Sequence, residues 1–332
     1  MSASGSSKTA PAAALVIIII IAALCFQAPV RAQSLAAKAF YQPEELFEFK
    51  DETAPQSQAA FAAGVCFAVS PGDDICVYSN SSGILYLMDL KGSVLKKLDF
   101  RDYDLSGRPL EVCSICVSEK GAVYLLDRKN SKIITVTKDF KISGFYSKNN
   151  IFAEDYILPP AEIYLDASGA LMVYQQAADA TFFFSPGELS LVKKSAFRAA
   201  ASTFARPSKE FYSLNKAGST LEITLYGPQG AESFKNIRCG GFADGIFMAE
   251  KSYDGSLFIG ARILNNDRYE FRIIQIDEKA AVKSDAPVKN IGHALNSAAL
   301  TSTGRILALL PGAKNGEGLF VNELKKIKPA EE

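Results

Sequence analysis

Three patterns in the sequence predict an all-β fold, a six-bladed β-propeller made of four-stranded antiparallel blades. After residue 45, short apolar or alternating runs follow one another, separated by Gly, Pro, Asn, Asp and Ser, which is typical of strands and turns rather than helices. Tight turns near residues 92, 139, 187, 229 and 278 recur at intervals of 42 to 49 residues. A period in the forties with four strands per unit is the pattern of a propeller. A separate N-terminal strand is available to complete the last unit.

The first 32 residues have the layout of a secretion signal. Lys8 precedes an apolar run at residues 12–23, which is shorter than the roughly 20 residues that a membrane-spanning helix needs. Val30-Arg31-Ala32 supplies small residues at the two positions that a signal peptidase recognises. We therefore expect cleavage before Gln33 and an exported protein, located in the periplasm or outside the cell.

Two alternatives to simple cleavage remain open. Cys25 follows the apolar run and is a candidate for lipidation, although Leu24 stands where a lipobox requires Gly, Ala or Ser. The segment can also stay uncleaved as an anchor, and only in that case do we expect contact with a membrane.

The repeat unit is a strand, a tight turn and a second strand rich in Ser, Lys or Phe. Its clearest copies turn at Lys91-Gly92 and at Lys138-Asp139-Phe140. A second hairpin precedes each copy, for example at Glu119-Lys120-Gly121, where Gly supplies the positive φ that a tight turn needs. The remaining turns of both kinds lie at residues 71–73, 167–169, 186–187, 228–230, 253–255, 277–278 and 302–304.

One unit, at about residues 199–237, is less regular than the others. Its first strand lies within residues 198–205, where Thr203 is the only β-branched residue. We expect this strand to be the weakest of the repeat, because β-branched side chains favour extended structure.

The last unit lacks its outer strand. Five units are complete, whereas residues 294–323 supply only three strands. Residues 46–50 form a short alternating strand, and pairing it with residues 319–322 would close the fold and remove two open sheet edges. No long polar linker divides the chain. We therefore expect one propeller domain over residues 44–327, with a linker at 33–43 before it and a charged tail at 328–332 after it.

The segment from Gly121 to Ile134 resembles a blade of the NHL-repeat propellers. Gly121 opens the second strand, Asp127 ends it, and Asn130-Ser131-Lys132-Ile133 begins the third strand. Elsewhere the likeness consists of the hydrophobic pattern and the turn glycines. The resemblance implies a propeller architecture for the mature chain and carries little information about function.

The cysteines do not form a disulfide framework. Five remain after signal removal, and an odd number cannot be fully paired. Most lie in apolar strand-like runs, where Cys behaves as a small hydrophobic residue. Cys113 and Cys116 have the spacing of a redox or zinc motif, but residues three apart in a regular strand point to opposite faces, so we favour buried thiols. The five are Cys66, Cys76, Cys113, Cys116 and Cys239.

Composition excludes several classes of function. The chain has 36 basic and 36 acidic residues, so it lacks the positive charge of a nucleic-acid-binding protein. His293 is the only histidine, so a histidine metal site or a Ser-His-Asp triad would depend on this one residue. No phosphate-binding loop, dinucleotide fingerprint or EF-hand loop is present. We therefore expect no cofactor and no bound metal.

The candidate binding residues lie in the loops that join successive blades. Such loops emerge at the same end of a propeller, and Arg, Tyr and Phe are enriched at binding hot spots. Because acidic residues accompany the arginines, the alternative is a solvated rim of internal ion pairs. The candidates are Arg101, Tyr103, Arg108, Phe152, Asp155, Tyr156, Arg206, Arg238, Phe242 and His293.

Two function classes follow from these patterns. The favoured one is a monomeric, non-enzymatic binding or scaffold module of the cell envelope or extracellular space, with a protein, peptide or glycan as its partner. The alternative is a propeller hydrolase, lactonase or lyase with a divalent cation on the channel axis. We favour the first class, because the innermost strands, such as residues 65–69 and 112–117, are apolar and offer few metal ligands.

Overall fold

The computed structural model describes residues 39–51, 64–103, 110–130, 132–146, 161–165, 171–175, 180–184, 191–195, 199–200, 211–227, 230–252, 254–277, 281–291, 298–312 and 318–328. Residues Ala39–Lys328 belong to one compact unit. Within the described ranges every element is a strand except one 3-10 turn, η1 (Phe100–Asp102). None of these residues forms a helix long and apolar enough to cross a membrane. The predicted signal segment lies outside the described residues.

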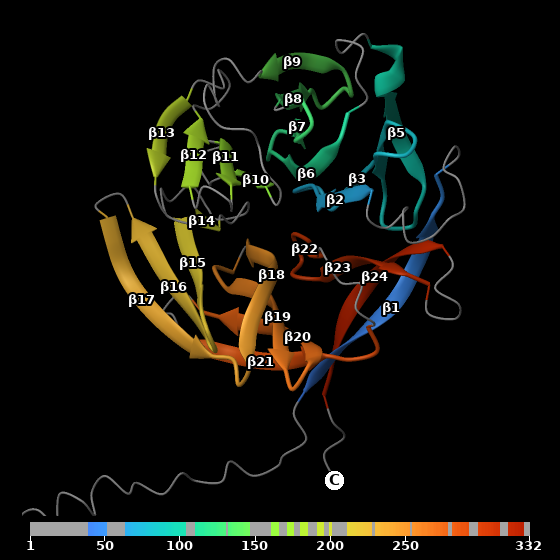
Figure 1. Cartoon of the computed structure of the whole chain (residues 1–332). Coiled ribbons are helices and arrows are strands. Elements are labelled where there is room, and N and C mark those ends of the chain that lie inside the picture. The colour runs from blue at the N-terminus through green and yellow to red at the C-terminus, as the bar shows by residue number, and fades with distance from the viewer. Residues whose placement is uncertain are drawn as a thin grey trace, which may run out of the picture. The chain divides into compact units, whose positions relative to one another are not determined.

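Four sheets have four strands each, and the strands of each sheet pair in the order of the sequence (Figure 1). All pairs within them are antiparallel, as predicted. The first two sheets are β2 (Val65–Val69), β3 (Ile75–Ser79), β4 (Ile84–Met88) and β5 (Val94–Asp99), and β6 (Val112–Val117), β7 (Val123–Asp127), β8 (Lys132–Val136) and β9 (Ile142–Tyr146).

The third and fourth sheets repeat this arrangement. The fourth begins with a strand of only two residues, in the unit whose first strand was predicted to be the weakest. Their strands are β10 (Ala161–Leu165), β11 (Leu171–Gln175), β12 (Ala180–Phe184) and β13 (Leu191–Ser195), and β14 (Ala199–Ala200), β15 (Phe211–Ala217), β16 (Thr220–Gly227) and β17 (Gly230–Arg238).

The last two sequence units form a single eight-stranded sheet, whose strand order is β18-β19-β20-β21-β1-β24-β23-β22. The N-terminal strand joins its two halves, and Figure 1 shows it in blue beside the red β24. The strands are β1 (Phe40–Phe49), β18 (Phe242–Lys251), β19 (Leu257–Asn265), β20 (Arg268–Ile276), β21 (Val282–Val288), β22 (Ala298–Leu300), β23 (Ile306–Pro311) and β24 (Leu319–Ile327).

The predicted pairing of the N-terminal strand is confirmed. β1 runs antiparallel to β24 from the Phe40–Ile327 pair to the Phe49–Leu319 pair. The strand is longer than predicted, because it begins at Phe40, within the segment expected to be a linker. It also touches β21 in parallel, at the pairing of Tyr41 with Val288. This second contact, which the sequence pattern did not predict, merges the two units into one sheet.

The hydrophobic core lies between neighbouring sheets rather than at one centre. Val77 and Tyr78 are consecutive and both fully buried, but they belong to different clusters. Tyr78 packs with residues of β6–β9, whereas Val77 packs with Leu307 and Val321 of the eight-stranded sheet. Successive strand residues point to opposite faces. A strand covered on both faces therefore reads as a continuous apolar run, as β3 does.

The cysteines follow this packing, with one correction. All five described cysteines are free thiols, and burial raises the pKa of Cys113 to about 12. The prediction that Cys113 and Cys116 point to opposite faces is wrong, because both pack against the cluster between the second and third sheets. The pairing of β6 with β7 shifts between Val112 and Ser114. A β-bulge at this point changes which way the side chains face.

Candidate functional site

One end of each sheet carries both the turn between its second and third strands and the segment that leads to the next sheet. This follows from the antiparallel order of the strands. We call it the loop end. The described segments at the loop end include residues 80–83, 100–103, 110–111, 128–130, 218–219, 239–241, 266–267, 289–291, 312 and 318.

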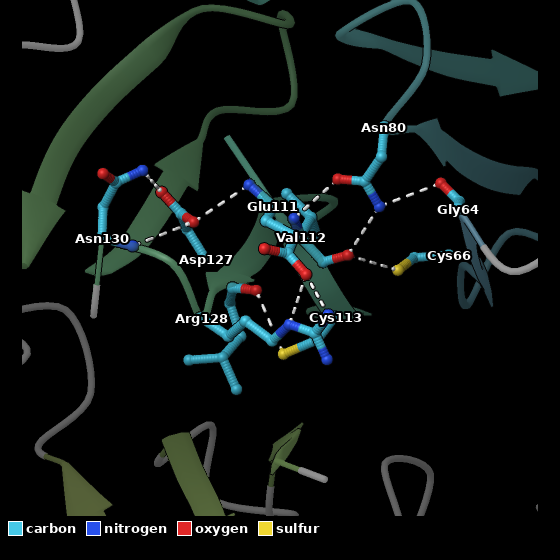
Figure 2. Close-up of polar contacts among 10 residues, drawn as sticks. Gly64, Cys66, Asn80, Glu111, Val112, Cys113, Asp127, Arg128 and Asn130 are labelled. Atoms are coloured by element: carbon cyan, nitrogen blue, oxygen red, sulfur yellow. Dashed lines mark hydrogen bonds and ion pairs between the residues drawn. The ribbon is translucent and has the colours of Figure 1, made fainter. Parts of the chain in front are cut away.

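A side-chain amide ties the first sheet to the second at the loop end (Figure 2). Asn80 Nδ2 donates to the carbonyl oxygens of Gly64 and Val112 at 2.9 and 2.8 Å, and Asn80 Oδ1 accepts from the Val112 amide at 2.7 Å. Cys66 Sγ donates to the same Val112 oxygen at 3.2 Å. Asn80 thus bonds to both backbone polar groups of Val112, the first residue of β6, and joins them to Gly64 ahead of β2.

Replacing Asn80 with Ala is expected to destabilise the protein by about 2 to 3 kcal/mol. The change removes three hydrogen bonds, at roughly 1 kcal/mol each, and leaves the Val112 amide without its acceptor, whereas the Gly64 and Val112 carbonyls keep the backbone amide of residue 80 and the Cys66 thiol as donors. Urea denaturation of the purified protein measures the loss. Asn236→Ala, at an exposed position of β17, is the matched control, and equal midpoints for the two variants would contradict the role assigned to Asn80.

The residues that resemble an NHL-type blade serve the structure of the turn. Asp127 is fully buried and its carboxylate accepts from the Glu111 amide, the Asn130 amide and Asn130 Nδ2, at 3.1, 3.3 and 2.5 Å. Arg128 Nε donates to Glu111 Oε1 at 2.6 Å. Figure 2 shows the contacts of Asp127 with Asn130 and the pair of Arg128 with Glu111, which both lie near the start of β6. Asp127 and Asn130 therefore hold the β7–β8 turn, and Arg128 is neutralised by Glu111.

Arg101 and Tyr103 are the first two predicted binding residues that the structure describes. Asp99 accepts from the Arg101 amide and from Arg101 Nε, both at 2.9 Å. These hydrogen bonds from Arg101 lower the pKa of the Asp99 carboxyl. The guanidinium of Arg101 is therefore already ion-paired, whereas Tyr103 is exposed.

Arg238 and Phe242 flank the segment that leads from the fourth sheet into β18. Arg238 is exposed at the end of β17, and Phe242 is 55% exposed at the start of β18. Gly240 has a φ of +75°, and a Cβ on Gly241 would lie 2.7 Å from the Leu264 carbonyl oxygen. The two glycines let the chain turn closely past the end of β19, which sets Phe242 at the rim.

The other predicted binding residues lie outside the described residues. They are Arg108, Phe152, Asp155, Tyr156, Arg206 and His293. The gathering of all ten candidates at one end therefore stays a prediction.

Sequence reasoning missed four residues near Phe242. Tyr269 is 41% exposed, and Arg262 lies over its ring with the guanidinium carbon 5.1 Å from the ring centroid. Arg262 Nε donates to Asp244 Oδ2 at 2.6 Å. Phe242 and Tyr269 are both in register with Leu264. We call Phe242, Asp244, Arg262, Leu264 and Tyr269 the rim patch.

A turn within a sheet, rather than a joining loop, places the rim patch. Asn266 and Asp267 connect β19 to β20 with φ values of +47° and +60°, as a type I′ hairpin turn requires. Asn and Asp tolerate this conformation. The Asn-Asp pair was thus a readable signal in the sequence, but the search for binding residues was directed at the loops between units.

Glu250 is a second feature that sequence reasoning did not single out. Its Oε2 accepts from the Leu300 amide at 2.5 Å, across the contact between β18 and β22. Burial raises the pKa of the Glu250 carboxyl to about 8. A carboxyl group titrating near neutral pH is available to hold or release a proton. Among the described residues no group of three or more His, Cys, Asp or Glu side chains is placed to hold a metal ion.

Comparison with known proteins gives similarity in fold. No family model matches the sequence, and no curated protein matches it. Catalytically inactive virginiamycin B lyase from Staphylococcus aureus, solved with quinupristin, has a TM-score of 0.51 and 12% identity, over 86% of this chain and 88% of the lyase. The "Putative exported protein" of Bacteroides fragilis NCTC 9343 has a TM-score of 0.50 and 11% identity, over 89% and 98% of the two chains.

The fold is propeller-like. At these identities the likeness extends to the architecture alone, and it agrees with successive four-stranded antiparallel sheets whose first strands contact one another, as β10, β6, β2, β22 and β18 do in turn. The NHL-type likeness of residues 121–134 stays a prediction, because no family model matches.

Proposed function

We propose that this chain is an exported, non-enzymatic binding module that holds a protein, peptide or glycan at the loop end. The observation that carries the proposal is the rim patch, in which two exposed aromatic rings flank an arginine held in place by a carboxylate. Exposed aromatic and arginine side chains are typical of binding hot spots. The remaining predicted loop residues would extend this surface.

Six blades are the arrangement that we infer for the scaffold. β18–β21 form one four-stranded unit, and β22–β24 with β1 form another, so the eight-stranded sheet counts as two blades. The first strands of these two units, β18 and β22, contact each other as do the first strands of separate sheets. In this arrangement the loop ends of the blades face the same side.

Export is inferred from the first 32 residues. An apolar run of this length followed by Val30-Arg31-Ala32 favours cleavage before Gln33. The name of the Bacteroides fragilis structure with a similar fold supports the same location.

Replacing Phe242 and Tyr269 with Ala is expected to reduce capture of a partner by about tenfold, since truncating a hot-spot residue costs more than about 1 kcal/mol. The measurement is a pull-down from envelope extract by the immobilised mature protein, with glycans and proteins both quantified. The matched control replaces Val94 and Phe145, which are 53% and 45% exposed on β5 and β9. Equal capture by both double variants, at unchanged melting temperatures, would contradict a binding role for the rim patch.

The alternative function is a propeller hydrolase, lactonase or lyase with an axial divalent cation. The raised pKa of Glu250 favours it, because a carboxyl group that titrates near neutral pH suits general acid–base catalysis. Adding calcium, manganese or zinc to the purified protein separates the two functions. A rise in melting temperature with one of these ions supports the enzyme, because a ligand that binds the folded state stabilises it.

A further inference from the structure

We infer that the rim patch recognises the sugar rings of an uncharged polysaccharide. This inference rests on the proposed binding function and names the class of ligand that the patch would take. It departs from the acidic ligand that a cluster of loop arginines would suit.

The first observation is that carboxylates neutralise the arginine of the rim patch and two other arginines at this end of the sheets. Within the rim patch Arg262 pairs with Asp244, as Arg101 pairs with Asp99 and Arg128 with Glu111 elsewhere at this end of the sheets; Arg238 and Arg268, outside the patch as defined, are exposed and have no carboxylate partner among the described residues. Each pair is close to neutral, so these guanidinium groups contribute little net attraction for an anion. An anionic ligand would have to displace the Asp or Glu side chain that already bonds to each of these guanidinium groups.

The two aromatic side chains carry the second step. Phe242 on β18 and Tyr269 on β20 are both in register with Leu264 on β19, so they lie on the same face of the sheet. Neighbouring strands are about 4.8 Å apart, which separates the two positions by roughly 10 Å. Two exposed rings at this spacing match the span of a disaccharide, whose C–H faces pack against aromatic rings.

The Asp244–Arg262 pair carries the third step. Arg262 Nε is bonded to Asp244 Oδ2 at 2.6 Å, and its guanidinium is fixed over the Tyr269 ring. Both side chains are partly exposed. A planar donor group and a carboxylate acceptor therefore lie beside the aromatic rings in a preset geometry. Sugar hydroxyls both donate and accept, so they can bond to both members without requiring net charge.

An extended peptide fits this patch less well. Peptides that bind by adding a strand need an unpaired sheet edge. Leu264 and Tyr269 belong to β19 and β20, each paired on both sides, whereas Phe242 and Asp244 belong to β18, the edge strand of the sheet. A peptide strand added to β18 would lie in the plane of the sheet, beside Phe242, and would not cross the sheet face that carries Leu264 and Tyr269.

The test is affinity electrophoresis of the mature protein in native gels. The neutral probes are hydroxyethyl cellulose, galactomannan and dextran, and the anionic probe is polygalacturonate. We expect at least one neutral probe to slow the protein and polygalacturonate to have no such effect. The Phe242→Ala, Tyr269→Ala double variant should raise the apparent Kd at least tenfold. Arg262→Lys should raise it several-fold, because lysine lacks the planar donor group.

Phe145→Ala is the matched control, since it removes a similarly exposed ring from β9, and it should bind as the unaltered protein does. The inference is overturned if none of the three neutral probes slows the protein, if polygalacturonate alone does, or if the double variant keeps full affinity. In the first two cases, patch-dependent capture of a protein from envelope extract would leave the proposed binding function standing. If the patch neither binds a neutral polysaccharide nor contributes to capture of a protein, the proposed function is contradicted as well.

Discussion

Deleting residues 33–50 is expected to lower the free energy of unfolding by about 5 kcal/mol or more. The deletion removes the whole of β1, whose pairing with β24 extends from Phe40 to Phe49. Tyr41 and Phe49 are buried, and burying an aromatic side chain contributes roughly 1.5 to 3 kcal/mol. The Phe49 ring also meets the Tyr86 ring at 5.4 Å, so the first and last units lose a direct contact.

Thermal unfolding followed by circular dichroism measures this effect, and we expect a drop in melting temperature on the order of 10 °C. The matched control deletes only residues 33–38, which leaves β1 intact. The longer deletion should also promote self-association, because it exposes the edges of β21 and β24. If the two truncated proteins melt together and remain monomeric by size-exclusion chromatography, β1 does not close the fold.

Replacing Glu250 with Gln is expected to remove a pH dependence of stability. In the unfolded chain the Glu250 carboxyl loses its proton near its ordinary pKa of 4.5, whereas burial keeps it protonated in the folded protein up to about pH 8. Unfolding between these values therefore releases a proton. The stability of the natural protein falls with rising pH across this window, by at most about 1.4 kcal/mol per pH unit from this group.

The Gln side chain has no proton to lose and can still accept a hydrogen bond from the Leu300 amide. The variant should match the natural protein near pH 5 and exceed its stability at pH 8.5. Urea denaturation at half-unit steps of pH gives the two curves. Glu119→Gln, in an exposed turn, is the control. Parallel curves for the natural protein and the Glu250 variant would show that burial does not perturb this carboxyl.

The repeat and its closure were predictable because their signals are local. Gly92, Gly121 and Gly304 all adopt positive φ in hairpin turns, and only a few residue types tolerate that conformation. The apolar runs between the turns alternate with the period of a strand, which places each residue on one face or the other. The strand near residue 46 was recognisable for the same reason, and an incomplete last unit showed where it pairs.

The candidate site was only partly predictable. Phe242 was found because the sequence placed it in a segment between units, and it begins β18; its neighbours Arg262 and Tyr269 lie within strands and were not found. The arginines and acids of the loops were visible in the sequence, yet the choice of partners was not. Arg128 bonds to Glu111, which lies 17 residues away, and such a pairing depends on where the start of β6 lies beside the β7–β8 turn.

The sequence by itself determined the all-β class, the period of the units and the strand that completes the last one, because turn residues and side-chain alternation act over a few neighbouring positions. Tertiary structure decided the parallel contact of Tyr41 with Val288, the bond of Asn80 to Val112, and the raised pKa of Glu250. Each of these joins segments that are far apart in the chain. Their energies depend on burial and on backbone groups of another sheet. Neither can be predicted from the residues that are close by in the sequence.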